Sequence, residues 1–539
     1  MPEKIVQDKS SYTNVIFILT DDQGVWAAGC YGNHEIRTPN IDRLAKTGMM
    51  FENFFVATPV CSPSRATLFT GRIPSQHGVH DWIRGGNVGP DAIRYMEGET
   101  AYTDVMAKHG YVCGMSGKWH LGDSQHPQFS FTHWYVHQKG GGPYYNAPMV
   151  REGKLVNEPG YVTNLITDEA LKFIDAHMDE PFYLSVHYTA PHSPWINNHP
   201  KEIVDSYDNC PFETCPQEPR HPWARFNLQC FGNRECLKGY FAAVTAMDMD
   251  VGRILDHLEE YGLRDKTLVV FMSDNGFSCG HHGIWGKGNA TWPRNMYENS
   301  IKVPCIFSHP GRIPQGKVQT EMVSAYDFMP TLLEYLDLPV PNAENLPGTS
   351  FLPLLLDQPM EGREKVVIFD EYGPVRMIRT EEWKYVHRYP DGPNELYDLV
   401  NDPDERRNLI DDPSQKKRIE ELKAEMEAWF ARYVDPSRDG IIDDGTGYVR
   451  IVFFDEVAEK LVGMKAEEIQ KLTPEERFEV VKSKLLGKEF VVRGNVRMNE
   501  VFDRLEISVK RVKQVSVSME IKKLIEDIQK LDVAIGEKK

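Results

Sequence analysis

The sequence has no long apolar run and no excess of positive charge. None of its 539 residues lies in a stretch approaching the about 18 consecutive apolar residues that a membrane-spanning helix needs. The N-terminal segment also lacks the apolar core of a secretory signal, so we expect a cytoplasmic protein without a membrane partner. Lys and Arg total 61 against 79 Asp and Glu, a formal charge of -18. Such a surface repels nucleic acid, and an anionic ligand requires a local basic site.

Cysteine is scarce as well. Nine cysteines, an odd number at wide spacing, do not make the framework of a disulfide-rich secreted domain. Four of them cluster in one segment without the paired CxxC spacing that zinc sites commonly use. Two disulfides, a zinc site and reduced thiols therefore all stay open for Cys210, Cys215, Cys230 and Cys236.

The composition changes near residue 440. Every Trp, His and Cys precedes this point, and of 35 prolines only Pro474 follows it. Residues 441–539 contain 19 basic and 19 acidic side chains, so the whole charge of -18 belongs to residues 1–440. Since domains typically span about 100 to 200 residues, we predict a large domain over 1–364, a small α+β subdomain over 365–440 and a distinct tail over 441–539.

Before residue 365, apolar β-rich runs alternate with amphipathic helical stretches. Residues 14–19, 182–186 and 267–271 are clear examples of such runs. Near-continuous apolar strands separated by helices predict an α/β fold, in which helices sandwich a buried, mostly parallel sheet. Ligands bind at the carboxyl ends of such strands, so the polar residues that follow each run are candidates for a site.

Two of these runs end in acidic residues. Asp21 and Asp22 end the first, and Asp274 and Asn275 follow the third. Their side chains offer only oxygen, which suits calcium or magnesium rather than zinc. Taken alone, each pair is better explained as a turn or a helix cap, because Asp commonly occupies both positions.

A third candidate is the pentapeptide Cys61-Ser62-Pro63-Ser64-Arg65, followed by residues that favour a helix. Proline near a helix start places Cys61 at a predicted helix N-terminus, where free N–H groups and the helix dipole favour an anion. A single cysteine is usually a small buried apolar residue. Here Ser64 and Arg65 lie beside it, which indicates a site for an anionic group.

The pentapeptide, extended to Gly71-Arg72, resembles the signature of type I sulfatases, in which the cysteine is oxidised to formylglycine after translation. Further blocks resemble the family in the same order along residues 12 to 440: Asp21-Asp22, Gly117–Gly122, Pro191–Pro194, Ser273–Gly276, His282–Lys287 and Glu395–Leu399. The resemblance implies an alkaline-phosphatase-like fold. It also implies a formylglycine-generating maturation enzyme as a partner.

The resemblance further implies a set of site residues. One divalent cation, calcium with magnesium as the alternative, would be bound by Asp21, Asp22, formylglycine from Cys61, Asp274 and Asn275. The sulfate would be surrounded by Arg65, Lys118, His120, His192 and Lys287. Ser64 and His282 would support these groups.

The implied reaction is hydrolysis of a small-molecule or saccharide sulfate ester. One hydroxyl of the formylglycine hydrate attacks sulfur with help from Asp274, and His192 or Lys287 protonates the leaving alcohol. The second hydroxyl then releases sulfate, with His120 as the base. Two alternatives stay open: a phosphonate monoester or phosphodiester hydrolase on the same scaffold, and an inactive protein whose Cys61 is never converted.

Other polar and aromatic side chains near these motifs have no assigned role. They either line the substrate mouth or pack beneath a loop, and the sequence favours neither. These side chains are His77, His80, Trp82, Arg84, Trp285 and Arg294.

The tail has its own pattern. Residues 441–454 predict a hairpin, residues 489–492 and 504–515 a strand pair, and helices are predicted near Thr473 and over residues 519–531. The hairpin, Gly494–Asn499 and Phe502–Leu505 resemble the later part of the oligonucleotide-binding fold of archaeal replication protein A. The first strand of that fold is missing and the net charge is zero, so we interpret the tail as an incomplete module. Binding of single-stranded nucleic acid through it is a further alternative function.

Overall fold

The computed structural model describes residues 12–90, 92–360, 363–370, 374–389, 392–434, 441–443, 448–450, 464–465, 468, 490–499 and 504–514. The chain divides into two compact units, residues 1–427 and 428–539. In the part of the chain that is described, no helix combines the length and apolar character needed to cross a membrane.

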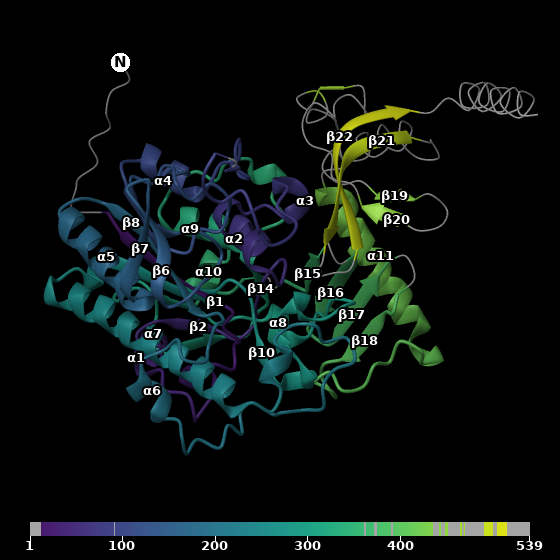
Figure 1. The fold of residues 1–539 in the computed structure, drawn as a ribbon, viewed down its shortest axis with the longest axis horizontal. Helices are drawn as coiled ribbons and strands as arrows, with labels where there is room; N and C mark the ends of the chain where they lie inside the picture. The colour runs from purple at the N-terminus through teal and green to yellow at the C-terminus, as the bar shows by residue number, and fades with distance from the viewer. Residues whose placement is uncertain are drawn as a thin grey trace, which may run out of the picture. The chain divides into compact units, whose positions relative to one another are not determined.

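A ten-stranded sheet forms the centre of the larger unit (Figure 1), with the order β13-β2-β12-β9-β1-β8-β4-β5-β6-β7. Its five central strands, β9 to β5 in this order, are parallel, while β12 and β6 pair antiparallel with both of their neighbours. The predicted α/β class with a mostly parallel sheet is therefore confirmed. The strands are β1 (Asn14–Asp21), β2 (Met49–Phe51), β4 (Val112–Gly117), β5 (His133–His137), β6 (Tyr145–Arg151), β7 (Lys154–Tyr161), β8 (Phe182–Pro191), β9 (Thr267–Ser273), β12 (Cys305–Ser308) and β13 (Lys317–Gln319).

The central strand β1 separates two apolar cores. All eight of its residues are buried. Successive side chains of a strand point to opposite faces of the sheet, so Phe17 and Leu19 pack in one core and Ile16 and Ile18 in the other. The first core includes residues of α2, α4 and α9, and the second includes residues of α1, α5 and α7. The near-continuous apolar run is thus explained by burial on both faces.

The helices and short strands that surround the sheet are listed here with their bounds. The α-helices are α1 (Pro39–Lys46), α2 (Cys61–Thr70), α3 (Pro74–His77), α4 (Tyr102–Lys108), α5 (Val162–His177), α6 (Lys201–Asp205), α7 (Arg234–Glu260), α8 (Glu298–Ile301), α9 (Phe328–Tyr335), α10 (Leu352–Leu355) and α11 (Lys416–Tyr433). The 3-10 helices are η2 (Gly29–Tyr31), η3 (Leu228–Cys230), η4 (Arg264–Lys266), η5 (His281–Gly283), η6 (Gly288–Ala290), η7 (Ala325–Asp327), η8 (Ala343–Asn345) and η9 (Pro413–Gln415). Short strands are β3 (Phe54–Phe55), β10 (Ser278–Cys279), β11 (Trp285–Gly286) and β14 (Val323–Ser324).

A second, antiparallel sheet follows in the chain, with the strands β15 (Lys365–Asp370), β16 (Val375–Thr380), β17 (Trp383–Arg388) and β18 (Glu395–Asp398). The buried Lys384 of β17 connects it to α8, because its Nζ lies 2.7 Å from Glu298 Oε1 and 2.5 Å from Glu405 Oε1. Three buried charges satisfy one another at this junction.

The tail contains two antiparallel strand pairs within its described residues. One pair is β19 (Ile441–Asp443) with β20 (Tyr448–Arg450), and the other is β21 (Phe490–Asn499) with β22 (Arg504–Gln514). These are the predicted hairpin and strand pair. The helices predicted near Thr473 and over residues 519–531 lie outside the described residues.

The four clustered cysteines do not share one state. Cys230 and Cys236 form a disulfide, while Cys210 and Cys215 are free thiols. A zinc site built by all four is therefore wrong, and of the two disulfides and the reduced thiols left open by the sequence, the structure has one disulfide and two free thiols.

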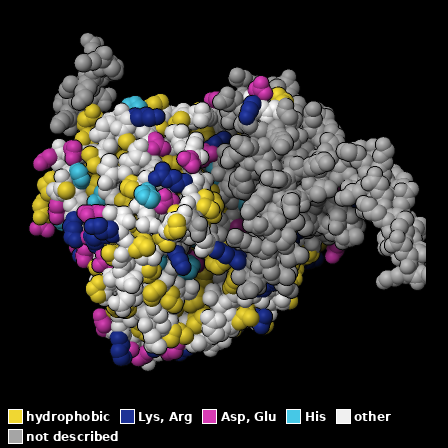
Figure 2. Space-filling model, turned by 45° about the horizontal axis from the view of Figure 1, so that its top comes forward, with side chains coloured by type: hydrophobic (Ala, Val, Ile, Leu, Met, Phe, Trp, Pro, Cys, Tyr) yellow, Lys and Arg dark blue, Asp and Glu magenta, His cyan; other side chains and the backbone are white. Residues whose placement is uncertain are grey.

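Charged side chains are intermingled on the surface. Figure 2 shows Lys and Arg beside Asp and Glu over the coloured part of one face. On this face, acidic and basic groups lie close enough to neutralise one another locally.

Candidate active site

The site begins at the carboxyl ends of β1 and β9. These strands run side by side, with Thr20 opposite Ser273, and the Asp274 N–H donates to Thr20 O at 3.0 Å. Asp21 ends β1, and Asp22 turns away from it with a left-handed φ of 66°. Its N–H lies 3.4 Å from Asp274 Oδ1. The parallel register thus brings together Asp21-Asp22 and Asp274-Asn275, two polar pairs that are about 250 residues apart in sequence.

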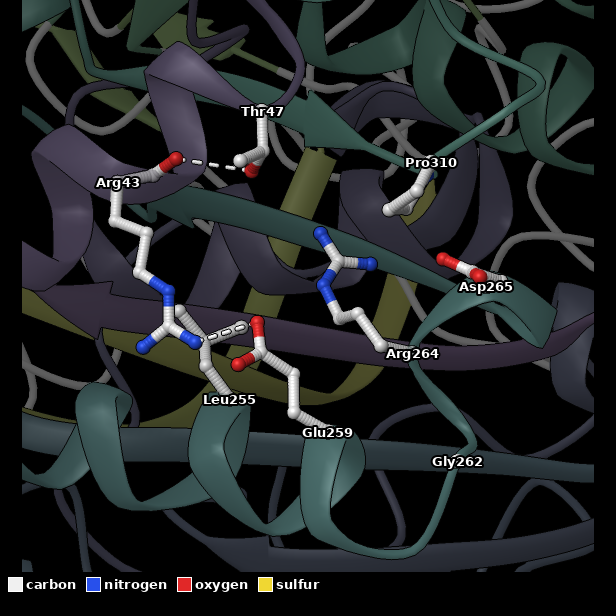
Figure 3. Close-up of a pocket in the computed structure, with 8 residues that line it drawn as sticks. All are labelled: Arg43, Thr47, Leu255, Glu259, Gly262, Arg264, Asp265 and Pro310. Atoms are coloured by element: carbon white, nitrogen blue, oxygen red, sulfur yellow. Dashed lines mark hydrogen bonds and ion pairs between the residues drawn. The ribbon is translucent and has the colours of Figure 1, made fainter.

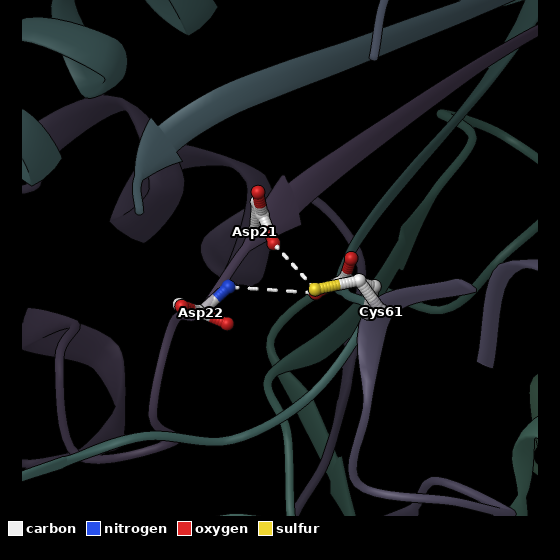
Figure 4. Close-up of side chains that lie close together, drawn as sticks. Asp21, Asp22 and Cys61 are labelled. Atoms are coloured by element: carbon white, nitrogen blue, oxygen red, sulfur yellow. Dashed lines mark hydrogen bonds between the residues drawn. The ribbon is translucent and has the colours of Figure 1, made fainter. Parts of the chain in front are cut away.

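Helix α2 presents Cys61 to these acidic residues. The helix begins at Cys61 itself after the extended residue Val60, and all ten of its residues are buried. Cys61 Sγ lies 3.4 Å from Asp21 Oδ1 (Figure 4). The helix is anchored by Ser62, whose hydroxyl donates to His120 O at 2.9 Å, and by Arg65, whose Nη1 donates to Lys118 O at 2.9 Å. These contacts hold the first turn of α2, and with it Cys61, beside Asp21.

The cluster has the chemistry of a cation site. One ligand atom from each of Asp21, Asp22, Cys61 and Asp274 lies within 4.8 Å of the others, and all four residues are buried. Asn275 donates its Nδ2 to Asp22 Oδ1 at 2.7 Å, while its buried Oδ1 has no hydrogen-bond partner. A buried carbonyl oxygen without a partner is costly. The predicted ligand set, which supplies oxygen atoms for a hard cation, thus fits a divalent ion.

Three cationic side chains lie against the three carboxylates. Lys118 Nζ is 2.5 Å from Asp21 Oδ2, Lys287 Nζ is 2.5 Å from Asp22 Oδ1, and Arg65 Nε is 2.8 Å from Asp274 Oδ2. These six charges balance without any ion or substrate. The buried Nη2 of Arg65 has no partner, which leaves one guanidinium donor for an anion.

The two predicted histidines differ in exposure and in the ring nitrogen that is engaged. His120 is buried with a left-handed φ of 59°, and its Nε2 donates to Ile83 O at 3.0 Å. Its Nδ1 is buried without a partner. The His192 side chain is 23% exposed, its Nδ1 donates to Ser193 O at 2.7 Å, and its Nε2 is 3.8 Å from Asp22 Oδ2. His120 thus presents a lone pair inside the site, and His192 an N–H or lone pair at its edge.

Burial and neighbouring charges shift the pKa values of these groups. Burial, and then the charges of Lys118 and Arg65, hold the pKa of His120 well below its usual value, so the ring is neutral. Burial, together with Asp21, raises the pKa of Asp274 to about 6. Burial acts in the same direction on Asp21, but Lys118 and the other cations outweigh it and lower the pKa of that carboxyl. Burial also raises the pKa of the Cys61 thiol to about 12.

Two further residues, His282 and Ser64, were expected to support the sulfate-binding side chains. His282 stacks on Tyr297 with ring centroids 4.0 Å apart, and the charges that act on it are those of Arg406 and Glu218. His282 has a left-handed φ of 54°, and its contact with Tyr297 neither confirms nor excludes the predicted supporting role. Ser64 is buried in α2, and its hydroxyl has no partner.

The side chains without an assigned role fall into two groups. His77, His80, Trp285 and Arg294 are buried and pack inside the protein. Trp82 and Arg84 are more accessible, and the Arg84 guanidinium lies 4.8 Å from the Trp82 ring centroid. Trp82 and Arg84 are thus the more exposed of these six side chains.

The sequence reasoning missed two features. His187 of β8 is buried, and its Nδ1 lies 3.4 Å from Arg65 Nη1. The loop Gly140-Gly141-Gly142 packs on the histidines, since a Cβ at Gly140 would lie 2.2 Å from His120 Nε2 and one at Gly141 would lie 3.1 Å from His192 Cε1. Three consecutive glycines are a visible signal of a close approach.

Known proteins share this architecture. The sulfatase family model matches residues 13–338, and the model named N-sulphoglucosamine sulphohydrolase, C-terminal, matches residues 280–431. The N-acetylglucosamine-6-O-sulfatase of Bacteroides thetaiotaomicron is 27% identical over 515 residues, with 80% of this chain and 89% of that protein covered. The sulfatase YidJ of Escherichia coli is 30% identical over 474 residues, with 79% and 88% covered.

A solved structure agrees with these matches. It is 26% identical, has a TM-score of 0.67, and covers 78% of this chain and 98% of its own. That protein was solved in complex with its substrate, D-glucosamine-2-N,6-O-disulfate. The family match spans more than half of the chain and includes both acidic pairs, Cys61 and the cationic residues around them. The chain therefore belongs to the sulfatase family and is a sulfuric ester hydrolase.

Proposed function

We propose that this protein hydrolyses a sulfate ester of a saccharide, using formylglycine made from Cys61 and a bound Ca²⁺. The observation that carries the proposal is the convergence of four buried ligand atoms within 4.8 Å of one another, surrounded by Lys118, Lys287 and Arg65. This arrangement offers a cation and an anion adjacent positions in one buried site.

Asp21, Asp22, residue 61, Asp274 and Asn275 would bind the cation. The partnerless Oδ1 of Asn275 and the carboxylate oxygens supply hard ligands, which calcium takes in larger number than magnesium. When bound, the ion supplies Lewis acidity that polarises oxygen and favours ionised hydroxyl. Lys118 and Lys287 would then be released from part of their pairing with Asp21 and Asp22, so that they can face an anion.

The state of Cys61 supports its conversion. A buried thiol with a pKa of about 12 is protonated at neutral pH and is a poor nucleophile. As formylglycine, residue 61 would supply a hydrated aldehyde with two hydroxyls, one for attack on sulfur and one for release of sulfate. The start of α2 fixes this position between Asp21 and Lys287.

The cationic side chains would bind and orient the sulfate group. Lys118, Lys287 and the partnerless Nη2 of Arg65 are donors that converge on the site. Because they are held in a buried environment, they can stabilise the charge that develops on the transferring sulfuryl group without reorganising. An acidic protein thereby concentrates positive charge at one point.

Two histidines would move the protons. His120 is neutral, and its Nε2–H is fixed on Ile83 O, so its free Nδ1 is the atom that would accept a proton from a hydroxyl on residue 61. His192 is partly exposed at the edge of the site, and its Nε2 can reach the oxygen of a departing alcohol. Lys287 would be engaged with the sulfate deeper in the site, so we assign the acid role to His192 at the edge.

The proposed substrate class rests on the relatives. Two of them are named for sulfated amino sugars, the N-acetylglucosamine-6-O-sulfatase and the protein solved with glucosamine disulfate. We therefore propose a sulfated amino sugar as the first substrate to test, with Trp82 and Arg84 as side chains available to the sugar.

The test measures release of sulfate from N-acetylglucosamine 6-sulfate and from 4-nitrophenyl sulfate, with bis(4-nitrophenyl) phosphate, a phosphodiester, and a phosphonate monoester as comparisons. We expect sulfate esters to be preferred. A preference for the phosphorus esters would instead favour the phosphonate monoester or phosphodiester alternative. Mass spectrometry of the tryptic peptide over residues 47–65 separates aldehyde from thiol at Cys61, and an intact thiol in active protein would overturn the formylglycine proposal.

Nucleic-acid binding through the tail is a separate proposal that the sequence alone supports. The matches to known families end at residue 431, and much of residues 441–539 lies outside the described part of the chain. Binding of a labelled single-stranded oligonucleotide at several salt concentrations tests it, since such binding weakens steeply as salt increases.

A further inference from the structure

Two free cysteines from distant parts of the chain meet outside the active site. Cys215 lies in the segment between α6 and α7, and Cys279 ends β10, four residues after Asn275. Their exposed fractions are 1% and 0%, and both pack in the same apolar core. Neither cysteine has a role in the reaction described above.

The main chain brings these cysteines close together. Gln217 Nε2 donates to Cys215 O at 3.0 Å and to Cys279 O at 2.8 Å, so the two carbonyl oxygens are at most 5.8 Å apart. A Cβ added at Gly280 would lie 2.5 Å from Pro216 O. The Cys215 side chain also contributes to raising the pKa of Cys279, as a neighbouring thiol does. This closeness of the main chains suits a disulfide, because cysteines whose backbones lie near each other need little movement to join their sulfurs.

A nearby segment of the same chain already contains a disulfide. Cys230 and Cys236 are bonded at the start of α7, and Cys230 follows Cys215 by 15 residues in the chain. We propose that, under the conditions that close this first disulfide, Cys215 and Cys279 form a second disulfide, which tethers the segment between α6 and α7 to the strand that follows Asp274 and Asn275.

The chemistry is thiol–disulfide exchange with a small disulfide such as oxidised glutathione. One cysteine thiolate attacks that disulfide and releases one glutathione thiolate, and the second cysteine then displaces the other glutathione. The two cysteines lose two protons and two electrons, and oxidised glutathione becomes two molecules of reduced glutathione. Since burial raises the pKa of Cys279 in the folded chain, the exchange takes place while the segments are still open during folding.

The closed bond would restrict the unfolded chain. It joins residues 64 positions apart, and a loop of this length gives a large loss of conformational entropy on closure. We expect the oxidised protein to unfold at a temperature roughly 5 °C higher than the protein that lacks this bond.

The test refolds the full chain from denaturant in glutathione buffers that range from reducing to oxidising. Free thiols are then blocked with N-ethylmaleimide under denaturing conditions, and the protein is digested with trypsin. Cys215 falls in the peptide over residues 202–220 and Cys279 in that over 267–287, while the peptides over 226–234 and 235–238 contain Cys230 and Cys236. We expect a linked 202–220/267–287 pair, two mass units lighter than the sum of its thiol forms, in the buffers that link the reference pair.

Two results would overturn the proposal. One is labelling of Cys279 by N-ethylmaleimide at every redox poise, whatever the state of Cys230. The other is a bond from Cys279 to Cys210, which shares the 202–220 peptide and is distinguished from Cys215 by fragmentation or by Cys210→Ser.

Matched variants test the same bond without mass spectrometry. Cys215→Ser and Cys279→Ser should each remove the roughly 5 °C part of the reductant-dependent change in unfolding temperature. Cys305→Ser, at a buried free thiol of β12, should leave that part intact. An equal reductant effect in all three variants and the parent would contradict the bond. These readouts do not involve turnover, so they stand whether or not the proposed sulfatase chemistry is correct.

Discussion

The two ends of β9 both hold buried charged groups, but they satisfy them in different ways. At its amino end, a hollow of about 290 Å³ is lined by Arg43, Thr47, Leu255, Glu259, Gly262, Arg264, Asp265 and Pro310 (Figure 3). There, Arg264 donates to Thr267 O and Ser308 Oγ, and Arg43 pairs with Asp256 and Glu259. At its carboxyl end, Arg65 Nη2, His120 Nδ1 and Asn275 Oδ1 are buried without partners.

At β9, the end that holds the family's site residues is the end with partnerless buried polar atoms, and the hollow lies at the other end. Polar atoms that are buried without partners cost free energy, and such a cost is commonly retained where a ligand completes the hydrogen bonds. The hollow at the amino end has paired cations and a structural explanation. The cluster at the carboxyl end lacks that explanation until a cation and an anion are bound.

The largest effect is expected for Cys61→Ser. Serine retains one hydroxyl but cannot provide the hydrated aldehyde, so we expect sulfate release to fall on the order of 10³-fold or more. The rate is measured with 4-nitrophenyl sulfate, and the unfolding temperature checks the fold. Cys113→Ser is the control, because this buried thiol donates to Thr103 O and lies outside the site. Turnover by Cys61→Ser at the parental rate would show that the carboxyl end of β9 does not owe its activity to Cys61, and the contrast with the amino end would fail.

Removal of the cation should have the next largest effect. Exhaustive chelation is expected to lower turnover on the order of 10²- to 10³-fold, since a bound ion contributes several kcal/mol of charge stabilisation, and added Ca²⁺ should restore it. Because an ion that binds only the folded state stabilises it, the unfolding temperature should rise with Ca²⁺. Asp22→Asn should weaken both responses. A chelated protein with unchanged rate and stability would show that the carboxyl-end cluster is purely structural.

Gly140→Ala probes the wall of the site rather than its charges. The new methyl group would collide with the His120 ring, which lies 2.2 Å from the Cβ position, and a displaced base should lower kcat about 10- to 10²-fold with a smaller change in KM. Gly85→Ala is the matched control, because no atom lies within 4 Å of its Cβ position. If both variants keep the parental kcat, His120 does not depend on this contact.

The dependence of stability on pH tests the amino end of β9 through His309. His309 bonds to Tyr335 Oη and Asp265 O, and burial, followed by the charges of Arg312 and Arg264, lowers its pKa to about 4. In the unfolded chain, His309 therefore binds a proton near pH 6.5, whereas in the folded chain it stays neutral until the pH approaches 4. The contribution of His309 to the free energy of unfolding is thus lost as the pH falls from 6.5 toward 4. We expect the parent to lose about 1 to 2 kcal/mol more than His309→Gln over this range, as measured by chemical unfolding. If the free energies of unfolding of the parent and of His309→Gln change equally with pH, the lowered pKa of His309 is contradicted.

The smallest effect is expected for Arg43→Ala. Its ion pairs with Asp256 and Glu259 are partly exposed, and such pairs contribute about 1 kcal/mol or less. Turnover should be unchanged, because the pair lies at the other end of β9 from the acidic cluster. A large loss of activity, with the fold intact by circular dichroism, would break the distinction between the two ends.

The sequence predicted the parts of the site that depend on strand order. Asp21, Asp22 and Asp274 follow apolar runs, and the carboxyl ends of parallel strands meet at one edge. Cys61 was predicted at a helix start because Pro63 and the helix-favouring residues after it define that start. These signals are local, and the sheet topology then brings them together.

The parts that the sequence did not predict depend on distance through space. His282 is five residues before Lys287 in the same motif, yet a left-handed turn carries it to Tyr297. The bond between Cys230 and Cys236 was left open because connectivity cannot be deduced from spacing alone. The three consecutive glycines indicate a close approach, but no local pattern shows that His120 is the side chain that approaches Gly140.

The complete burial of α2 has a consequence for biosynthesis. Cys61 is 1% exposed, and every residue of its helix is enclosed, so an enzyme of protein size has no access to this side chain once the core has formed. If Cys61 is converted to formylglycine as proposed, the conversion would have to precede folding, and a chain that folds first would keep its thiol. The fraction of converted protein would then depend on how fast the modifying enzyme acts relative to folding, and slower folding should increase it.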